Sequence, residues 1–571
     1  MPRLELILLL CSTVYGFEQS SKSGPHVCIA DGCLQGRHFT TPAGNRYEAY
    51  LGVPYAAPPV GELRFKNPRP IQPWSELYDA TFERSMCVQK NDLFLGEKVE
   101  GSEDCLYLNV YKPKKNINSP MAVMVFIHGG GFFAGSATMG QFGPERFMDT
   151  GEVILVVMQY RLGVFGFLST GDHAATGNFG LKDQNAALRW VQRNIEKFEG
   201  DPTLVTLFGH SAGGAAVQMH MMSSLSKGLF ARAIMMSGSA LGFWNQPISD
   251  PLDFARKQAA AVGIGSSDTL SSDELVAALR KIDASQLCSS VDKLKFWYVY
   301  PIAPYHVAVE KYIDNDTFIS EDPRKIWARG GYHQVPWRIG FVPNEGSFGS
   351  VAIVINSTLV ASLNEHSNSY IPRIVGCKEN DKSRNMLRNR FFPGGTEHHW
   401  ITDANVNQIQ TLFTEAFVLY PLALSVSQHN ALEADRKSPL DVYRFSFKSN
   451  HSNVKYFAKT DLDFGVGHAD DLPYLFRSPD LFDDYEHDSP DGVMAEKLVD
   501  YYKRFAYNGV SDESCQESCK ILEFTNSNNA SEPVKLNVIS GFDNEMVAFW
   551  SDIYSECAEI SECFNLKQDV I

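Results

Sequence analysis

The sequence predicts an α/β fold in which a large, mostly parallel sheet carries helices on both faces. Two continuous apolar runs, Ala122–Ile127 and Val153–Met158, have the composition of parallel strands that are buried on both sides. Gly180–Ile195 follows with apolar residues at a helical period, and Leu204–Phe208 is another short strand-like run. Strands that alternate with helices in this way are typical of a parallel sheet covered by helices.

The length and composition are consistent with one large domain. The chain has 571 residues, of which 44% are apolar, and it shows no linker, repeat or low-complexity boundary. We therefore expect a single domain over residues 17–571. The net charge of −16 argues against binding to nucleic acid or to anionic membrane surfaces, because both require clustered Lys and Arg.

The first sixteen residues have the pattern of a secretory signal peptide. Arg3 precedes an apolar segment that begins at Leu6, and Gly16 is the small residue at the expected cleavage site. This segment is too short to cross a membrane. The C-terminus, Asn565–Ile571, has no hydrophobic tail for a lipid anchor. We expect a secreted, extracellular protein without a membrane anchor; the sequence does not indicate its oligomeric state.

Cysteines and glycosylation motifs agree with export. Without Cys11, ten cysteines remain, an even number that suits disulfides in an oxidising compartment. We expect a Cys28–Cys33 pair across a turn, and a Cys87–Cys105 pair. The sequence does not pair the other six: Cys288, Cys377, Cys515, Cys519, Cys557 and Cys563. Asn-x-Ser/Thr motifs predict glycosylation at Asn315, Asn356, Asn450 and Asn529.

The remaining elements follow in chain order. Arg46–Ala56 predicts a strand that leads into a Pro-rich loop, and Glu103–Tyr111 predicts a strand with a cysteine at its start. Arg232–Met236 predicts another strand. From about residue 250 to 440 the pattern indicates many helices with inserted loops.

The segment Gly209–Gly213 reads Gly-His-Ser-Ala-Gly, a G-x-S-x-G pattern. The strand-like run lies directly before it, and Ala212–Met222, small and apolar without proline, suits a closely packed helix. An isolated match would equally describe a plain Gly-Ser turn. In this context, however, it predicts a sharp strand-to-helix turn that holds Ser211 in a strained conformation, with glycines where strand and helix meet. We expect Ser211 to be a nucleophile.

Four residues at the end of the Ala122–Ile127 run read His-Gly-Gly-Gly, from His128 to Gly131. Acyl transfer places a negative charge on a carbonyl oxygen, and preorganised backbone N–H groups stabilise that charge. Glycines permit the close approach that such donors need. We assign the oxyanion donors to Gly130, Gly131 and Ala212.

The chain resembles a known family over essentially its whole mature length. It is similar to the type-B carboxylesterase/cholinesterase family of α/β-hydrolases, and looks closest to the secreted insect β-esterases, which share the Gly-His-Ser-Ala-Gly-Gly form of the turn. The resemblance implies an α/β-hydrolase fold with long insertions and a serine-dependent hydrolysis of carboxylic esters. It rests on five motifs: Glu103–Asn109, His128–Gly131, Tyr160–Gly163, Gly177–Gln184 and Phe208–Gly214.

The general base and the acid should follow the serine, because this fold orders its triad as Ser, acid, His. His468 lies in a glycine-flanked loop, as the family's catalytic histidine does, and Glu345 follows a predicted strand end as Glu-Gly. We expect His468 to carry the serine proton and Glu345 to fix its tautomer. Asp470 and Asp471 are too close to His468 in sequence to face its Nδ1, so we expect them to be structural.

The resemblance also implies structural ion pairs of Arg161 with Asp183 and of Arg64 with Glu103. His210, next to the serine, could tune the site or simply pack under the turn. The pair His398-His399 has no further ligand spacing and is expected to be solvated. We predict no metal and no cofactor.

The substrate prediction is an uncharged, lipophilic ester. Cholinesterases carry a tryptophan for quaternary ammonium in the loop that corresponds to 87–105, and this loop has none. Candidate substrates are an odorant or pheromone, a dietary or xenobiotic ester, or juvenile hormone, although juvenile hormone esterases typically have Gln where this chain has His210. Phe132, Phe133 and Phe296–Tyr300 line an apolar pocket or belong to the core. The alternative from another class is a non-catalytic adhesion or signalling relative, which would usually lack a triad member.

Overall fold

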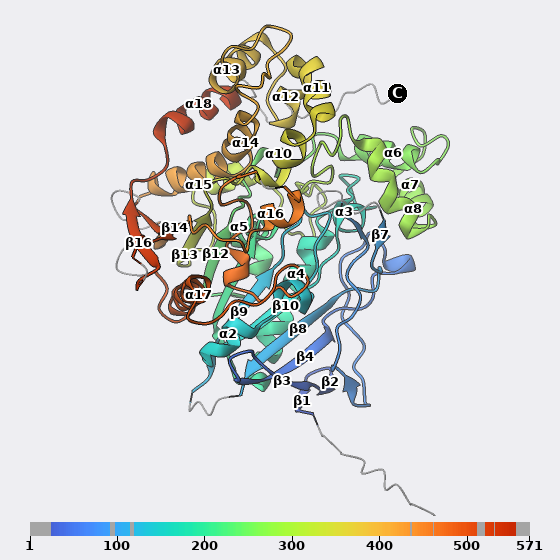
Figure 1. The fold of residues 1–571 in the computed structure, drawn as a ribbon. Coiled ribbons are helices and arrows are strands. Elements are labelled where there is room, and N and C mark those ends of the chain that lie inside the picture. Colours follow the sequence, from blue (N-terminus) through green and yellow to red (C-terminus); the bar gives the residue numbers. More distant parts are fainter. Residues whose placement is uncertain are drawn as a thin grey trace, which may run out of the picture.

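The computed structural model describes residues 24–91, 98–114, 119–433, 437–460, 462–510, 520–529 and 531–555 (Figure 1). The predicted signal peptide, the C-terminal segment and four of the cysteines (Cys515, Cys519, Cys557 and Cys563) lie outside the described residues.

The central feature is an 11-stranded sheet. The strands between β10 and β15 run parallel to their neighbours, whereas β8, β4, β3 and β16 add antiparallel edges. This confirms the predicted α/β-hydrolase fold class with a mostly parallel sheet. In spatial order the strands are β16 (Val534–Ile539), β15 (Ile521–Asn526), β14 (Leu440–Phe445), β13 (Trp337–Phe341), β12 (Arg232–Met236), β11 (Gly200–His210), β9 (Met121–Ile127), β10 (Val153–Met158), β8 (Tyr107–Pro113), β4 (Arg46–Pro54) and β3 (Arg37–Thr40).

Strand β9 shows why an uninterrupted apolar run was needed. All seven of its residues are buried. Because side chains alternate along a strand, Val123, Val125 and Ile127 enter one hydrophobic core, while Met124 and Phe126 enter the other. The sheet therefore separates two cores, and each requires its own layer of helices.

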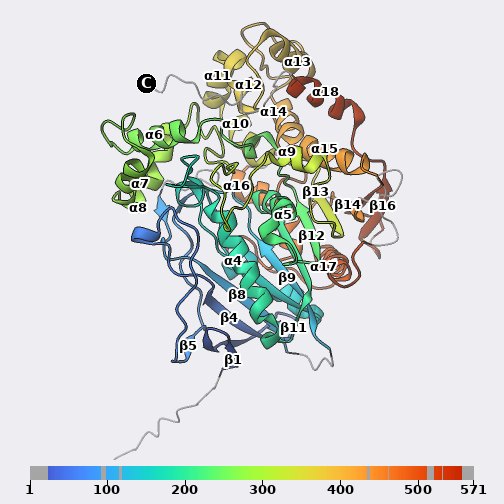
Figure 2. The same cartoon turned by 180° about the vertical axis from the view of Figure 1, so that it is seen from behind.

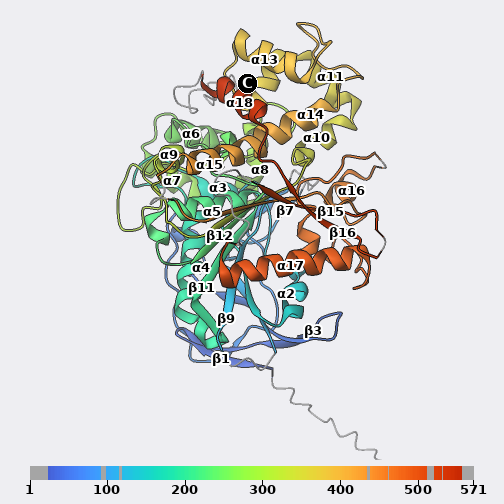
Figure 3. The same ribbon diagram turned by 90° about the vertical axis from the view of Figure 1, so that its left-hand side faces the viewer.

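Helices of the predicted type supply those layers. On one face α4 (Phe179–Asn194) and α5 (Ala212–Met222) lie over the sheet, and on the other face α2 (Glu145–Thr150) and α17 (Pro490–Asn508) do (Figures 2 and 3). Every residue of α5 is buried, which explains its small, apolar sequence. Helix α17 begins with a Ser489 cap followed by Pro490, a combination that favours a helix start.

The region between β12 and residue 440 is mostly helical, as predicted. Among its described residues, β13 is the one strand that joins the central sheet. Its helices gather beyond one end of the sheet (Figure 1). They are α6 (Pro251–Ala261), α7 (Ser272–Arg280), α8 (Ala284–Ser289), α9 (Pro323–Ala328), α10 (Ser347–Val354), α11 (Ser357–Glu365), α12 (Ser367–Ile374), α13 (Asp381–Phe391), α14 (Gln408–Phe413) and α15 (Tyr420–Asn430).

One continuous helical stretch in this region, Gln408–Asn430, is long and apolar enough to span a membrane. However, 72% of its most apolar window is buried inside the fold, as in the core helix of a globular protein. Its hydrophobicity is therefore accounted for by packing within the chain.

Shorter elements complete the chain. Strands β1, β2 and β5 form a small sheet, and β6 pairs with β7. Cys28 and Cys33 face each other across the β1–β2 hairpin and are disulfide bonded, as are Cys87 and Cys105. These elements are β1 (His26–Ile29), β2 (Gly32–Gln35), β5 (Tyr78–Asp79), β6 (Gln89–Lys90), β7 (Val99–Glu100), α1 (Met139–Phe142), α3 (Gly163–Phe167), α16 (Asn453–Ala458) and α18 (Asn544–Ser555).

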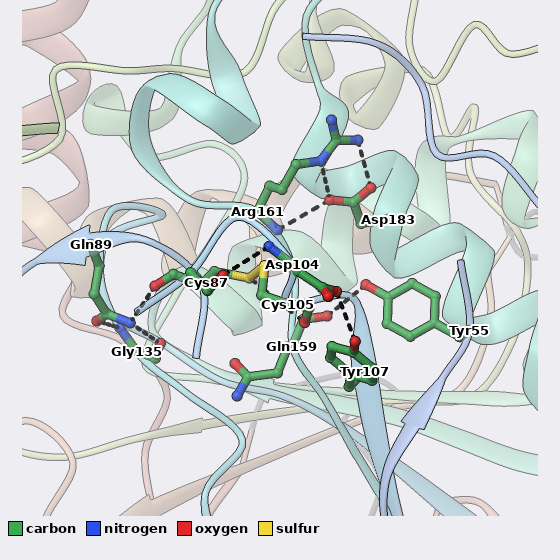
Figure 4. Close-up of a disulfide and its surroundings, with 11 residues drawn as sticks. Tyr55, Cys87, Gln89, Asp104, Cys105, Tyr107, Gly135, Gln159, Arg161 and Asp183 are labelled. Atoms are coloured by element: carbon green, nitrogen blue, oxygen red, sulfur yellow. Dashed lines mark hydrogen bonds and ion pairs between the residues drawn. A yellow bond between two sulfur atoms is a disulfide. The ribbon is translucent and has the colours of Figure 1, made fainter. Parts of the chain in front are cut away.

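Both expected ion pairs are present. The Arg161 guanidinium donates to both carboxylate oxygens of Asp183 at 2.7 Å (Figure 4). Its remaining nitrogen donates to the Lys66 carbonyl oxygen at 2.8 Å. Arg64 makes a similar two-point contact with Glu103. The Arg161–Asp183 pair is almost fully buried, so each charge depends on the other for solvation.

We expect Asp183→Asn to lower the free energy of unfolding by roughly 3 to 5 kcal/mol, because it leaves the buried Arg161 charge without its counter-ion. Urea unfolding measures the change. The matched control is Glu321→Gln, which removes the partner of Arg329 in an exposed pair and should cost less than about 1 kcal/mol. Equal effects of the two substitutions would contradict this account of the buried pair.

Candidate active site

The turn between β11 and α5 is built by backbone-to-backbone packing. Ser211 has φ 57° and ψ −121°, a strained conformation for a residue with a side chain. A Cβ on Gly209 would lie 2.5 Å from the backbone of Gly213, and a Cβ on Gly213 would lie 2.1 Å from the Ile127 carbonyl oxygen. The glycines of the G-x-S-x-G pattern are therefore required by contact, and Ser211 stands at the strand-to-helix junction.

The His-Gly-Gly-Gly loop lies directly against this turn. A Cβ on Gly129 would be 2.8 Å from the His210 carbonyl oxygen and 3.0 Å from the Ser211 Cβ. Gly130 and Gly131 both have positive φ, 103° and 59°, which a residue with a Cβ rarely adopts. The structure thus brings the predicted oxyanion loop and the predicted nucleophile together.

His128, at the start of this loop, is a structural residue. Its side chain is fully buried, and its ring stacks on Tyr160 at a centroid distance of 4.4 Å. The Tyr160 hydroxyl donates to the His128 carbonyl oxygen at 2.9 Å. Burial lowers the pKa of His128 to about 4, so the imidazole is neutral at physiological pH and adds no charge beside the loop.

The predicted acid and base are in direct contact. His468 Nδ1 lies 2.5 Å from Glu345 Oε2, and the other carboxylate oxygen accepts the Val342 N–H at 2.9 Å. Glu345 is fully buried just beyond β13, whereas the His468 side chain is 12% exposed. Because one ring nitrogen faces a carboxylate, the proton of a neutral imidazole belongs on Nδ1, which leaves Nε2 as an acceptor.

Several residues that no motif marks hold the His468 loop in place. The His468 N–H donates to the Ser347 hydroxyl at 2.9 Å, and Gly346 N–H donates to the Thr414 hydroxyl at 2.8 Å. Asp470 accepts the Gly467 N–H at 2.8 Å and the Ser452 hydroxyl at 3.0 Å. Asp470 thus has the structural role that was expected of it. The hydroxyl partners carry no sequence signal of their own, and Thr414 lies 68 residues from the Gly346 N–H that it accepts.

Asp471 is a second buried carboxylate behind the Glu345–His468 pair. It is fully buried and accepts a hydrogen bond from the Tyr443 hydroxyl at 3.2 Å. Burial, and then the charge of Glu345, raise the pKa of Asp471 to about 7. Its ionised form is therefore disfavoured in the folded protein.

His210 packs within the turn and also contacts the predicted base. Its ring centroid lies 4.6 Å from that of His468, and its side chain is buried. Burial, and then the neighbouring His468, hold the pKa of His210 well below its ordinary value. A neutral ring at this position places no net charge next to His468.

A pocket lies beside the oxyanion loop. Phe133, two residues beyond Gly131, forms part of the pocket wall. The Gly163 N–H, from another lining residue, donates to the carbonyl oxygen of the neighbouring Phe132 at 2.7 Å. Of the aromatic residues considered above, Phe132, Trp297 and Tyr300 belong to the core instead. The lining is mostly apolar: Val88, Lys90, Phe133, Leu162, Gly163, Val164, Phe165, Cys288, Val291, Lys295, Val299, Ile302, Pro304 and Tyr305.

The other predicted positions are also located by the structure. All four sequon asparagines, and the pair His398-His399, are exposed. No group of three or more potential metal-ligating side chains occurs within the described ranges.

The raised pKa of Asp471 predicts a pH-dependent stability. Below the ordinary carboxyl pKa of 3.8, Asp471 is protonated in both the folded and the unfolded protein. Between pH 3.8 and about 7 only the folded protein keeps this proton, so the free energy of unfolding falls as the pH rises. Above about pH 7 the folded protein carries a buried, ionised carboxylate. We expect Asp471→Asn to raise Tm more at about pH 8 than at about pH 5. Asp381→Asn, at a carboxylate that is 93% exposed, is the control and should change Tm equally at both pH values. A pH-independent effect of Asp471→Asn would contradict the assignment.

Several insect esterases are similar to this chain. Juvenile hormone esterase of Tribolium castaneum is 39% identical over 479 residues, which cover 82% of this chain and 80% of that protein. Venom carboxylesterase-6 of Apis mellifera is 34% identical over 575 residues, which cover 97% and 98%. Esterase E4 of Myzus persicae is 33% identical over 508 residues, which cover 87% and 89%.

A solved structure is similar over nearly the whole fold. The crystal structure of juvenile hormone esterase from Manduca sexta, with OTFP covalently attached, aligns with a TM-score of 0.79 and 25% identity, over 93% of this chain and 99% of that one. The family model described as "Carboxylesterase family" matches residues 23–550. The chain therefore belongs to the carboxylesterase family and is a carboxylic ester hydrolase.

Proposed function

We propose that this chain is a secreted serine carboxylesterase that hydrolyses uncharged, lipophilic esters through an acyl intermediate on Ser211. The observation that carries the proposal is the hydrogen bond between Glu345 and His468 Nδ1, next to a strained serine turn and a glycine-rich loop. Family membership supports ester hydrolysis in general. The identity of the nucleophile and of the substrate class is argued from the residues.

In the proposed reaction, His468 Nε2 takes the proton of the Ser211 hydroxyl while Oγ attacks the ester carbonyl carbon. The tetrahedral intermediate then collapses, the bond to the alcohol oxygen breaks, and His468 returns the proton to the leaving alcohol. Water attacks the acyl-enzyme by the same route and releases the acid and the free serine. Glu345 holds the imidazole tautomer and stabilises the imidazolium that forms twice in each cycle.

The negative charge of each tetrahedral intermediate falls on the former carbonyl oxygen. The N–H groups of Gly130, Gly131 and Ala212 are the proposed donors to it. Because these groups are fixed before the substrate arrives, they stabilise the charge without reorganisation, and each contributes roughly 3 to 4 kcal/mol. The close packing of Gly129 on the turn supports this assignment, since it holds the loop and the nucleophile in one rigid unit.

The apolar pocket beside Phe133 supports a lipophilic substrate. Juvenile hormone is a specific candidate, because two of the similar proteins are juvenile hormone esterases. An odorant, dietary or xenobiotic ester is the other candidate, because the lining is apolar. A direct comparison of the hydrolysis rates of these candidate esters identifies the preferred substrate.

Secretion is supported by the predicted signal peptide together with two disulfides, Cys28–Cys33 and Cys87–Cys105. The exposed asparagines Asn315, Asn356, Asn450 and Asn529 are accessible for glycosylation.

We expect an organophosphate to label Ser211 stoichiometrically, and the adduct to be located by peptide mass mapping. Ser211→Ala should lose about 10⁴-fold or more in kcat, because the remaining site can only bind the ester and polarise its carbonyl. The control is Ser350→Ala, at another buried serine, which should retain activity. An unlabelled Ser211 in folded, active protein would end the proposal.

The same assay separates the roles of the other two residues. Glu345→Gln keeps the shape of the side chain but removes the charge that faces Nδ1, so kcat should fall by orders of magnitude, and His468→Ala should cost at least as much. Wild-type rates in Glu345→Gln would move the acid role to another carboxylate.

The pocket predicts selectivity for chain length. Val291→Trp places a large side chain into the pocket, so kcat/KM for long-chain esters should fall by about 10-fold or more while acetyl esters are hydrolysed at nearly the wild-type rate. Val360→Trp, at a half-buried position on α11, is the matched control. A uniform loss for all chain lengths would show that this pocket does not hold the substrate.

A further inference from the structure

Gln89 joins the disulfide-closed loop to the oxyanion loop (Figure 4). Its Oε1 accepts the Gly135 N–H at 2.7 Å, and its Nε2 donates to the Gly135 carbonyl oxygen at 2.8 Å and to the Cys87 carbonyl oxygen at 3.1 Å. The side-chain amide therefore contacts both polar groups of one glycine and ties them to the backbone of Cys87.

Gly135 closes the oxyanion loop on itself. A Cβ on Gly135 would lie 2.3 Å from His128 Nδ1 and 2.5 Å from the Gly129 carbonyl oxygen, so the end of the loop packs on its beginning. Between these two points the Ala134 N–H donates to the Gly130 carbonyl oxygen at 2.9 Å. Fixing Gly135 therefore fixes the turn that contains Gly130 and Gly131.

The other end of the tether is also fixed. Gln89 is 5% exposed, and Cys87 is bonded to Cys105, two residues before β8. The Val88 N–H donates to the Ser102 carbonyl oxygen at 3.2 Å. The position of Gln89 is thus set from the central sheet, through the disulfide.

We propose that Gln89 is a positioning residue for the oxyanion hole: by holding Gly135 from both sides, it sets where the Gly130 and Gly131 N–H groups point. This inference rests on the proposed function. Because the oxyanion exists only along the reaction, a misplaced donor weakens transition-state binding and leaves substrate binding nearly unchanged. Gln89 therefore acts on kcat.

The test compares Gln89→Met with Gln192→Met. Both substitutions keep side-chain volume and remove an amide that donates to two backbone carbonyls; Gln192 contacts Pro202 and Leu229 instead. The readouts are kcat and KM for a short-chain ester, Tm, and the inhibition constant of a trifluoromethyl ketone. Such a ketone forms a tetrahedral adduct with an active-site serine. Gln89→Glu is a second variant that keeps the acceptor for the Gly135 N–H.

For Gln89→Met we expect kcat to fall roughly 10- to 100-fold with KM nearly unchanged, and the ketone to bind more weakly by a similar factor. Gln192→Met should change neither. Gln89→Glu, which sets a carboxylate against the two carbonyl oxygens that Nε2 contacts, should lose at least as much kcat as Gln89→Met. A loss confined to KM, or equal kcat values in the Gln89 and Gln192 variants, would overturn the inference. If wild-type protein does not hydrolyse esters or react with the ketone, the proposed function fails instead.

Discussion

The site depends on backbone packing that leaves no room for side chains. The junction of β9, β11 and α5 places Gly129, Gly209 and Gly213 against neighbouring backbone carbonyl groups at distances that exclude a Cβ. That packing keeps Ser211 in a conformation that costs of order 1 to 3 kcal/mol elsewhere. The strain is supported by the two hydrophobic cores on either side of the sheet, because any relaxation of the turn would have to separate the buried strands.

Electrostatics at the site follow from the same burial. His128 and His210 are kept neutral by desolvation, and the ionised form of Asp471 is disfavoured. The carboxylate in contact with His468 is Glu345, which accepts from Nδ1 and from a backbone N–H. The low-dielectric environment strengthens the Glu345–His468 hydrogen bond and makes any unpaired charge nearby costly in free energy. Spatial contact therefore decides which acid serves His468: Glu345 faces its Nδ1, although Asp470 and Asp471 are nearer to it in sequence.

The first half of the central sheet could be predicted, because β9 and β10 are uninterrupted apolar runs and the turns beside the site are glycine motifs. β9 and β10 were expected with their observed ends, give or take one residue, and the contact of Glu345 with His468 agrees with the expected order along the chain. The supporting residues were not predictable. The bond from Gln89 to Gly135 spans 46 residues, and a buried amide leaves no periodicity or motif in a single sequence. The edge strands β3 and β16 were also missed, because their residues are largely exposed and lack an apolar run.

The adjacency of β13 and β14 has a consequence for how such enzymes can diversify. These parallel strands pair directly, with Gly340 opposite Tyr443, although all the helices from α10 to α15 lie between them in the chain. Glu345 extends from the end of one strand, and the His468 loop is joined to it by the backbone bridge between Asn344 and Gly467. The relative position of acid and base is therefore set by the sheet, with support from Ser347 at the start of α10 and from Thr414. Helices α11 to α13 make none of these contacts, so they can be lengthened, shortened or exchanged without disturbing the pair. Substrate range can evolve in that insertion while the hydrolytic chemistry stays the same.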